Sequence, residues 1–469
     1  MNKNNYTRFF QAISDNDKGR RFNFTAGHIG AFSNIFKLDK NIKELDRKNI
    51  GNLVFLCTVT KLIFLLTLSI IPFKNVIFFI RGLLRKVINK NINLSKEFAV
   101  ISVGYGNSAS DPYLSKILLM LNSKFDYFKI VGGKKIKTKE FIFFEQALGI
   151  FDFLKCFISI FLVQYLAIFS LISFLFSKNR MGTKFFFLNY CLEEITSGAL
   201  YNNYLLDIFG KKINKYGSYK KVIFPMEGRN WEKKIVSNLN KFNCKVIGYI
   251  HCAITPFHLS LTSKNFYDLH ETPSIIITPS SMAFNLVSKI FINSKTIDGS
   301  FIRDNHVPNN LPVDKKYIVF VLTSYIPECE IIINSIVSSG LHNHYKVEIK
   351  LHPDSSTHNK VKKMIIDNNL SLFTGFSNTI PLACLFRSSS TAIEYLRVGI
   401  NPVYINLKSC FSNNIFDLDN LYNFTKLDIH KFDSFVPNKV LFTKKKCIRI
   451  SNYYLRISNP INFMGCIKD

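Results

Sequence analysis

The sequence is poor in acidic residues and has no closely paired cysteines. Asp and Glu number 32 against 61 Lys and Arg, which gives a formal net charge of +29 over 469 residues. The ten cysteines are scattered, form no C-x-x-C pair and often lie in apolar runs. They therefore argue against a disulfide framework and a zinc site, and they indicate a reducing compartment. Because the N-terminus is polar, we expect no signal peptide and a cytoplasmic catalytic body.

The sequence also lacks internal repeats, low-complexity tracts and an acidic metal-binding motif at the end of an expected strand. Asp-x-Asp occurs at Asp15 and Asp17 in the polar lead-in and again at Asp417 and Asp419 beyond the last clear strand, but neither copy ends a strand at the expected cleft. We therefore expect no metal and no cofactor. The basic residues are dispersed and no nucleic-acid-binding module is recognisable, which argues against nucleic acid as a partner. The positive charge instead favours phosphate-bearing molecules or anionic lipid headgroups.

Two apolar stretches indicate contact with a membrane. Residues 156–177 carry no charge and are long enough to cross a bilayer core of roughly 30 Å as a helix. Residues 53–80 are apolar but are interrupted by Lys61, Pro72 and Lys74, a pattern typical of an interfacial or re-entrant element. The alternative for both stretches is a buried helix in a phenylalanine-rich core. Peripheral, monotopic and single-span attachment all remain open.

The length exceeds what one hydrophobic core organises, so we expect more than one domain. Apolar runs of strand length alternate with segments of helical character, which predicts mostly parallel, doubly wound sheets. The sequence thus predicts an α/β fold with two Rossmann-like domains facing a cleft and additional apolar helices in the N-terminal half. The expected divisions are a basic lead-in 1–95, an N-terminal domain 96–311 and a C-terminal domain 312–469. The clearest expected strands are 98–103, 222–224, 245–250, 274–278, 317–322, 346–351 and 402–405.

Polar residues follow several of these strands, where functional groups gather in such sheets. Glu227 lies in a Glu-Gly turn after the strand 222–224, and His251 ends the next strand. His352 ends the strand 346–351, and Pro353 fixes the turn so that the imidazole can face the cleft and bind or protonate a phosphate. The alternative is that Glu227 and His352 are ordinary surface side chains.

A serine cluster precedes the last expected helix. Ser388, Ser389 and Ser390 follow an apolar strand, so their hydroxyls and the helix N-terminal amides can converge on a negative group. An ordinary helix cap is the alternative.

The Glu-Gly turn, the His-Pro pair and the serine cluster, in this order, resemble the motif series of bacterial sialyltransferases and polysialyltransferases. The residues around 226–232 and 247–251 also resemble surface carbohydrate biosynthesis proteins of O-antigen and capsule loci. The resemblance covers roughly 221–405, and it implies a GT-B fold and a CMP-activated nonulosonic acid donor. One departure is that the acidic-acidic-Gly motif of the first family appears here as Met226-Glu227-Gly228, with a single carboxylate.

The resemblance implies a role for each matching residue. Glu227 would be the general base, and His352 would contact or protonate the leaving phosphate. Glu394 would reach a ribose hydroxyl unless it is a solvated helix residue. The donor phosphate would lie against Pro353, Ser388, Ser389, Ser390 and Thr391, and candidate donor or acceptor contacts are Gly228, Arg229, His251 and Arg303.

The implied function is an inverting, metal-independent glycosyltransferase at the cytoplasmic face of the bacterial inner membrane. It would transfer a nonulosonic acid or Kdo-type sugar from a CMP-activated donor to a lipid-linked or lipid A-linked glycan of O-antigen, capsule or lipooligosaccharide. Two alternatives remain open. A CDP-glycerol-type polyol-phosphate transferase resembles the chain in its His-Pro pair and its Ser-Ser…Glu pattern. A non-catalytic subunit of a membrane glycan-assembly complex is the other alternative.

Overall fold

The computed structural model describes the chain in separate stretches. The described residues are 76–77, 79–80, 98–105, 114, 125–132, 142–159, 205–213, 219–228, 230–254, 261, 269–299, 308, 311–323, 326–352, 358–376, 378–387, 389–400, 402–407, 414–417, 422, 424–437 and 443–456. Most of the predicted lead-in 1–95 and of the run 156–177 lies outside them.

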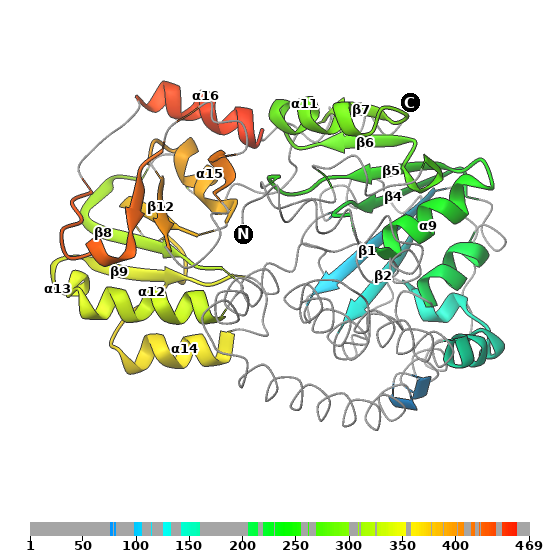
Figure 1. Ribbon diagram of the computed structural model, residues 1–469, viewed down its shortest axis with the longest axis horizontal. Coiled ribbons are helices and arrows are strands. Elements are labelled where there is room, and N and C mark those ends of the chain that lie inside the picture. The colour runs from blue at the N-terminus through cyan, green and yellow to red at the C-terminus, as the bar shows by residue number, and fades with distance from the viewer. Residues whose placement is uncertain are drawn as a thin grey trace, which may run out of the picture.

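The N-terminal domain is built on a seven-stranded sheet whose neighbouring strands are all parallel (Figure 1). Its spatial order is β3-β2-β1-β4-β5-β6-β7, so the chain winds outward from β1 in one direction and from β4 in the other. The strands are β1 Phe98–Tyr105, β2 Asp126–Gly132, β3 Ile142–Phe143, β4 Lys221–Pro225, β5 Lys245–Tyr249, β6 Ile275–Thr278 and β7 Lys295–Asp298.

The C-terminal domain repeats this plan with six parallel strands in the order β10-β9-β8-β11-β12-β13. Here the order reverses between β8 and β11. The strands are β8 Val313–Val321, β9 Lys346–Lys350, β10 Ser371–Leu372, β11 Ile380–Phe386, β12 Pro402–Asn406 and β13 Lys426–Asp428. The predicted α/β fold with two Rossmann-like domains is therefore confirmed.

Helices cover both faces of the second sheet, which explains the unbroken apolar runs of its strands. In β11, Cys384 and Phe386 join the buried cluster beneath α15 and α16, whereas Ala383 and Leu385 join the cluster beneath α12 and α14. This division follows from the alternation of side chains along a strand. The helices named in the two domains are α9 Asn230–Asn240, α11 Ser281–Ile290, α12 Ile326–Ser338, α13 Leu341–His344, α14 His358–Asp367, α15 Thr391–Arg397 and α16 Lys444–Tyr454.

The cysteines that the structure describes behave as small core residues. Five of the six, all except Cys252, are buried, and all six are free thiols. Burial raises the pKa of both Cys244 and Cys329 to about 12, which keeps their thiols protonated at neutral pH. The prediction that the cysteines are small core residues is confirmed for these five positions.

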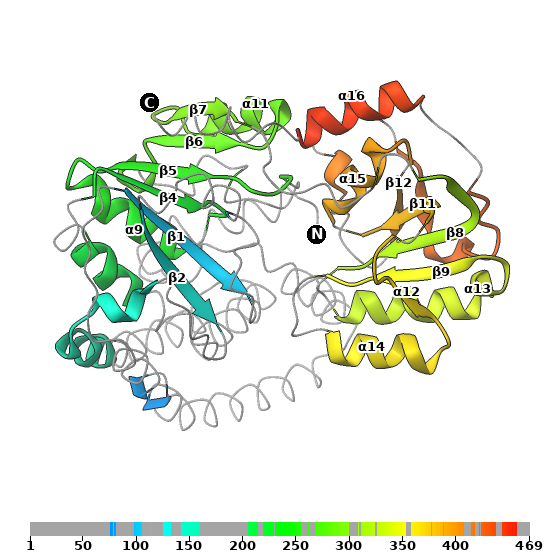
Figure 2. The same ribbon diagram turned by 180° about the vertical axis from the view of Figure 1, so that it is seen from behind.

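The carboxyl ends of the two sheets face each other. In both views the arrows of β4 and β5 point toward the C-terminal domain, and those of β8 and β9 point toward the N-terminal domain (Figures 1 and 2). The residues that follow these strands are therefore the ones that a molecule held between the domains would meet.

The residues just after α16 fasten the C-terminal domain to the N-terminal domain. The Nη2 of Arg456 lies 3.0 Å from Asp298 Oδ2 and donates to Ser281 Oγ at 2.5 Å, and its backbone N–H donates to the Pro279 carbonyl at 3.0 Å. Next to these polar contacts, Met282 of α11 packs into the buried cluster of the C-terminal domain. We did not predict this connection.

The predicted apolar helices are described only in part. Residues 76, 77, 79, 80 and 150–159 are helical, so the described start of the run 156–177 continues a helix that begins before it. Within the described stretches, no helix is both long and apolar enough to span a bilayer.

We expect Arg456→Ala to weaken the connection between the domains. The change removes a partly exposed ion pair and a hydrogen bond, so the free energy of unfolding should fall by about 1 kcal/mol. Urea denaturation measures this change. Arg449→Ala, which removes an exposed arginine from α16 itself, should have no such effect, and an equal loss in both variants would contradict the proposed role of Arg456.

Candidate functional site

Two predicted site residues lie in contact at the carboxyl edge of the first sheet. Glu227 follows β4 and His251 follows β5, and because these strands are parallel neighbours the residues beyond their ends meet. Glu227 Oε1 lies 3.0 Å from His251 Nε2. The His251 side chain is only 4% exposed and that of Glu227 is 16% exposed, so Glu227 is the member of the pair that is more open to a ligand.

The backbone around this pair is fixed by hydrogen bonds between strands. The Met226 N–H donates to the Tyr249 carbonyl at 2.7 Å, and the Ile250 N–H donates to the Ile277 carbonyl at 3.0 Å. Gly228 then turns the chain with φ +79°, a left-handed conformation that favours glycine. Glu227 thus lies in a rigid turn directly beyond β4, next to the point where the strand order reverses between β1 and β4.

Glu232, which we did not predict as a site residue, holds this turn from the first turn of α9. Its carboxylate accepts hydrogen bonds from the Glu227 N–H at 3.1 Å and the Gly228 N–H at 2.8 Å, and the residue is 2% exposed. In a capping box the Glu at the third helical position accepts from the N-cap N–H, and a Ser or Thr lies three residues before it. Glu232 reaches further back, to residues 227 and 228, and Arg229 lies three residues before it, so the sequence carries no capping-box signal for this role.

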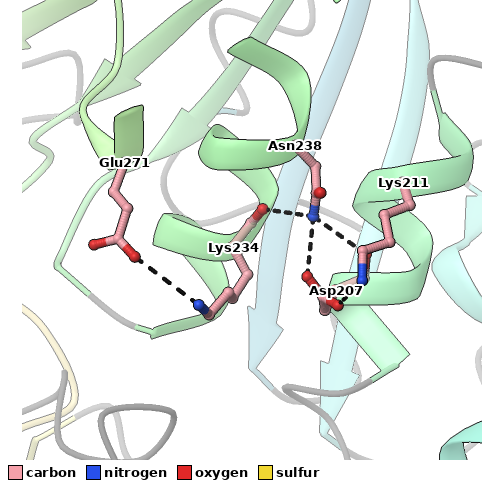
Figure 3. A network of polar contacts seen from close by, with 5 residues as sticks. All are labelled: Asp207, Lys211, Lys234, Asn238 and Glu271. Carbon is pink, nitrogen blue, oxygen red and sulfur yellow. Dashed lines mark hydrogen bonds and ion pairs between the residues drawn. The ribbon is translucent and has the colours of Figure 1, made fainter. Parts of the chain in front are cut away.

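A polar network anchors α9 itself (Figure 3). Asn238 Nδ2 donates to Asp207 Oδ1 at 3.0 Å and to the Lys234 carbonyl at 2.9 Å, while Lys211 pairs with Asp207 at 2.5 Å. On the other side of the helix Lys234 Nζ lies 3.9 Å from Glu271 Oε1. These contacts join α9 to the helix 205–213 and to the short helix Leu269–Glu271, so Glu232 acts from a fixed support.

The second sheet presents His352 and the serines at its own carboxyl edge. His352 is half-buried and follows β9, while Ser389 and Ser390 follow β11, and β8 lies between these two strands. Ser389 Oγ accepts a hydrogen bond from the Thr391 N–H at 3.3 Å, but the Ser390 side chain makes no capping bond to α15. Ordinary capping therefore accounts for Ser389 and not for Ser390.

Arg387, which opens the serine segment, is structural. It is fully buried, and its Nε and Nη2 both lie 2.9 Å from Glu328 Oε1 of α12, which is also fully buried. Its Nη1 donates to Tyr404 Oη and to the Ile405 carbonyl. A charge inside a protein is tolerated only with such partners. The pair fixes the point at which the chain leaves β11.

Other predicted site residues have mixed outcomes. Glu394 is 6% exposed, so the alternative that it is a solvated helix residue is wrong. Arg229, Arg303, Pro353 and Ser388 lie outside the described residues. Among the described residues, no group of three or more His, Cys, Asp or Glu side chains could hold a metal ion.

Comparisons with known proteins give distant likenesses in structure alone. No protein-family model matches the chain, and no curated protein matches it in sequence. A Staphylococcus aureus MnaA–UDP structure aligns at TM-score 0.44 and 9% identity, covering 79% of this chain and 95% of that one. Methanocaldococcus jannaschii UDP-GlcNAc 2-epimerase in complex with UDP-GlcNAc and UDP aligns at TM-score 0.41 and 11% identity, covering 79% of this chain and 98% of that one. Acinetobacter baumannii MurG aligns at TM-score 0.38 and 8% identity, covering 79% of this chain and 98% of that one. At these scores the likenesses carry no weight for function, and the fold assignment rests on the strand order.

We expect Gly248→Ala to disturb the Glu227 turn through Met226. A Cβ at position 248 would lie 2.8 Å from Met226 Sδ, which is closer than such atoms pack, and 3.1 Å from Pro273 Cγ, which is a tight contact. Such overpacking costs about 1–3 kcal/mol of unfolding free energy. Met226→Ala removes the sulfur, so the double variant should lose clearly less than the sum of the two single losses in chemical denaturation. Strict additivity would contradict the contact.

Proposed function

We propose that the protein is a glycosyltransferase that uses a nucleotide-activated sugar, with Glu227 as its general base. The observation that carries this proposal is the Glu227–His251 pair at the carboxyl edge of one sheet, opposite the edge of the other sheet that bears His352 and the serines. A carboxylate and a set of imidazole and hydroxyl groups on facing edges can serve the two halves of a sugar transfer.

The acceptor half of the reaction is assigned to the first domain. Glu227 takes the proton of an acceptor hydroxyl while the oxygen of that hydroxyl forms a bond to the anomeric carbon of the donor sugar. His251 lies behind Glu227 and positions its carboxylate through the 3.0 Å contact. Glu232 keeps the turn in place through the two backbone N–H groups.

The donor half is assigned to the second domain. The bond between the anomeric carbon and the phosphate oxygen breaks, and its electrons leave with the nucleotide. His352 binds or protonates that phosphate, and the hydroxyls of Ser389 and Ser390 donate hydrogen bonds to it. Pro353, Ser388 and Thr391 complete the proposed phosphate contacts, and Glu394 binds the nucleotide. Attack from the opposite domain inverts the anomeric carbon, and no step requires a metal.

The finer proposal is a CMP-activated nonulosonic acid or Kdo-type donor and a lipid-linked surface glycan as acceptor. It is supported by the order of the Glu-Gly, His-Pro and serine motifs. Gly228, Arg229 and Arg303 are the proposed substrate contacts. In this proposal the enzyme works at the cytoplasmic face of the inner membrane, and a CDP-glycerol-type transferase is the alternative that also releases CMP.

We expect Glu227→Gln to lower the rate of sugar transfer by a factor on the order of 100 or more, because the amide cannot accept the proton. Donor affinity should change little, since Glu227 lies on the other domain from the phosphate groups. Single-turnover transfer with calorimetric donor binding separates the two effects. Glu330→Gln on α12 is the matched control, and a fully active Glu227→Gln enzyme would remove Glu227 from the mechanism.

We expect nucleotide binding to depend on His352. Calorimetric titration of CMP, UDP, GDP and ADP should show selective binding of CMP that weakens roughly tenfold in His352→Ala. His430→Ala, which alters a histidine in the short helix Ile429–Lys431 of the same domain, should bind as the wild type does. Turnover of CMP-sugars against CDP-glycerol then separates the two donor classes. Preference for another nucleotide would overturn the CMP assignment, and no nucleotide binding would favour a non-catalytic assembly subunit.

A further inference from the structure

The helix 150–159 is fastened to the N-terminal domain by one of its faces. Phe153 and Cys156 are fully buried in the domain core. Asp152 on the same face accepts a hydrogen bond from the Gly149 N–H at 2.6 Å and pairs with Lys212 of the neighbouring helix. The inward face therefore carries the packing and the polar contacts that a surface helix of a soluble protein needs.

The outward face of this helix is apolar as well. Ile150 is 57% exposed, Phe151 80%, Leu154 47% and Ile158 53%. Positions 150, 154 and 158 are four residues apart and lie on one side of a helix. A surface helix normally places polar residues on its exposed side, but Lys155 is the only polar residue among the exposed residues of 150–159.

A second exposed apolar element lies beside the first. Val76, Ile77 and Ile80 are 41%, 47% and 49% exposed, and Phe79 between them contacts Phe157 with ring centroids 5.4 Å apart. Both views show the blue segment 76–80 next to the teal helix at one corner of the N-terminal domain (Figures 1 and 2). We call the exposed apolar side chains of these two elements the corner patch, which comprises Val76, Ile77, Ile80, Ile150, Phe151, Leu154 and Ile158.

The sequence around the corner patch indicates what covers it. The helix 150–159 runs directly into the uncharged stretch that ends at residue 177, and the segment 76–80 closes the apolar stretch that begins at residue 53. Basic residues adjoin both elements, namely Lys155 on the helix and Arg81, Arg85 and Lys86 after residue 80. Apolar side chains flanked by cations match a bilayer surface with anionic headgroups, where rings and aliphatic chains enter the headgroup and acyl boundary.

We propose that the corner patch docks the N-terminal domain onto an anionic lipid bilayer, with Phe151 and Leu154 inserted into the interface. The docking uses the exposed side chains of two adjacent helices and needs no membrane-spanning segment. It stands independently of the proposed transferase reaction, because it is measured without donor or acceptor.

A fluorescent reporter tests insertion at the patch itself. The chain has one tryptophan, Trp231, which is buried, so the variant Trp231→Phe with Phe151→Trp places a single indole on the corner patch. On vesicles of phosphatidylcholine and phosphatidylglycerol in equal parts, its emission should shift to shorter wavelengths and be quenched by brominated acyl chains. The control is the variant Trp231→Phe with Ile292→Trp, which places the single indole at another exposed position of this domain, since Ile292 is 78% exposed. Its emission should not change.

A flotation assay tests the contribution to binding. The full chain with Phe151→Asp and Leu154→Asp should partition to the same vesicles at least tenfold less than the chain with Ile292→Asp and Ile366→Asp, two exposed residues far from the patch. Circular dichroism confirms that each variant is folded. Unquenched Trp at position 151 with equal partitioning of the two variants would overturn the proposal. The proposal would also be overturned if the protein formed a dimer without lipid and only the Phe151→Asp, Leu154→Asp variant were monomeric, because the patch would then join two copies of the chain.

Discussion

The structure depends on one constraint: parallel strands that are covered on both faces can present polar side chains only beyond their ends. In β8 and β11 the residues of each face enter separate hydrophobic clusters, and no face is left for chemistry. Glu227, His251, His352 and the serines all lie where a strand has just ended. The two sheets point these ends at each other, so the same constraint that builds the cores also gathers the polar groups between the domains.

The sequence reveals the parts of this fold that are local and apolar. The strands near 222–224, 245–250 and 317–322 are predictable because burial on both faces leaves unbroken apolar runs, and the meeting of Glu227 with His251 follows from the pairing of consecutive strands. β2 is harder to predict, since it opens with Asp126, whose carboxylate accepts a 2.7 Å hydrogen bond from Tyr219 Oη. That partner is 93 positions away in the chain, so the sequence shows a charge where the fold has a buried pair.

The same limit applies to the candidate site. Arg387 adjoins three serines and resembles a phosphate ligand in the sequence, yet it is paired with Glu328, 59 positions earlier, inside the domain. Removal of Glu328 would leave the buried charge of Arg387 without compensation, while Tyr404 and the Ile405 carbonyl accept hydrogen bonds from its remaining nitrogen, Nη1. The contribution of the ion pair is the exit direction of the chain after β11, which places Ser389 and Ser390 at the edge of the sheet.

The contact of Arg456 with Asp298 and Ser281 has a mechanical consequence. It fastens the C-terminal domain to the N-terminal domain beside β6 and β7, at one lateral edge of the first sheet, while β1 and β4 lie toward its centre. A rigid rotation of one domain against the other that kept these contacts would therefore have its axis at this edge. Atoms near the axis would move least and those beyond β1 would move most, so such a rotation would separate the two domains beside the strand-order reversal while the contacts of Arg456 stayed intact.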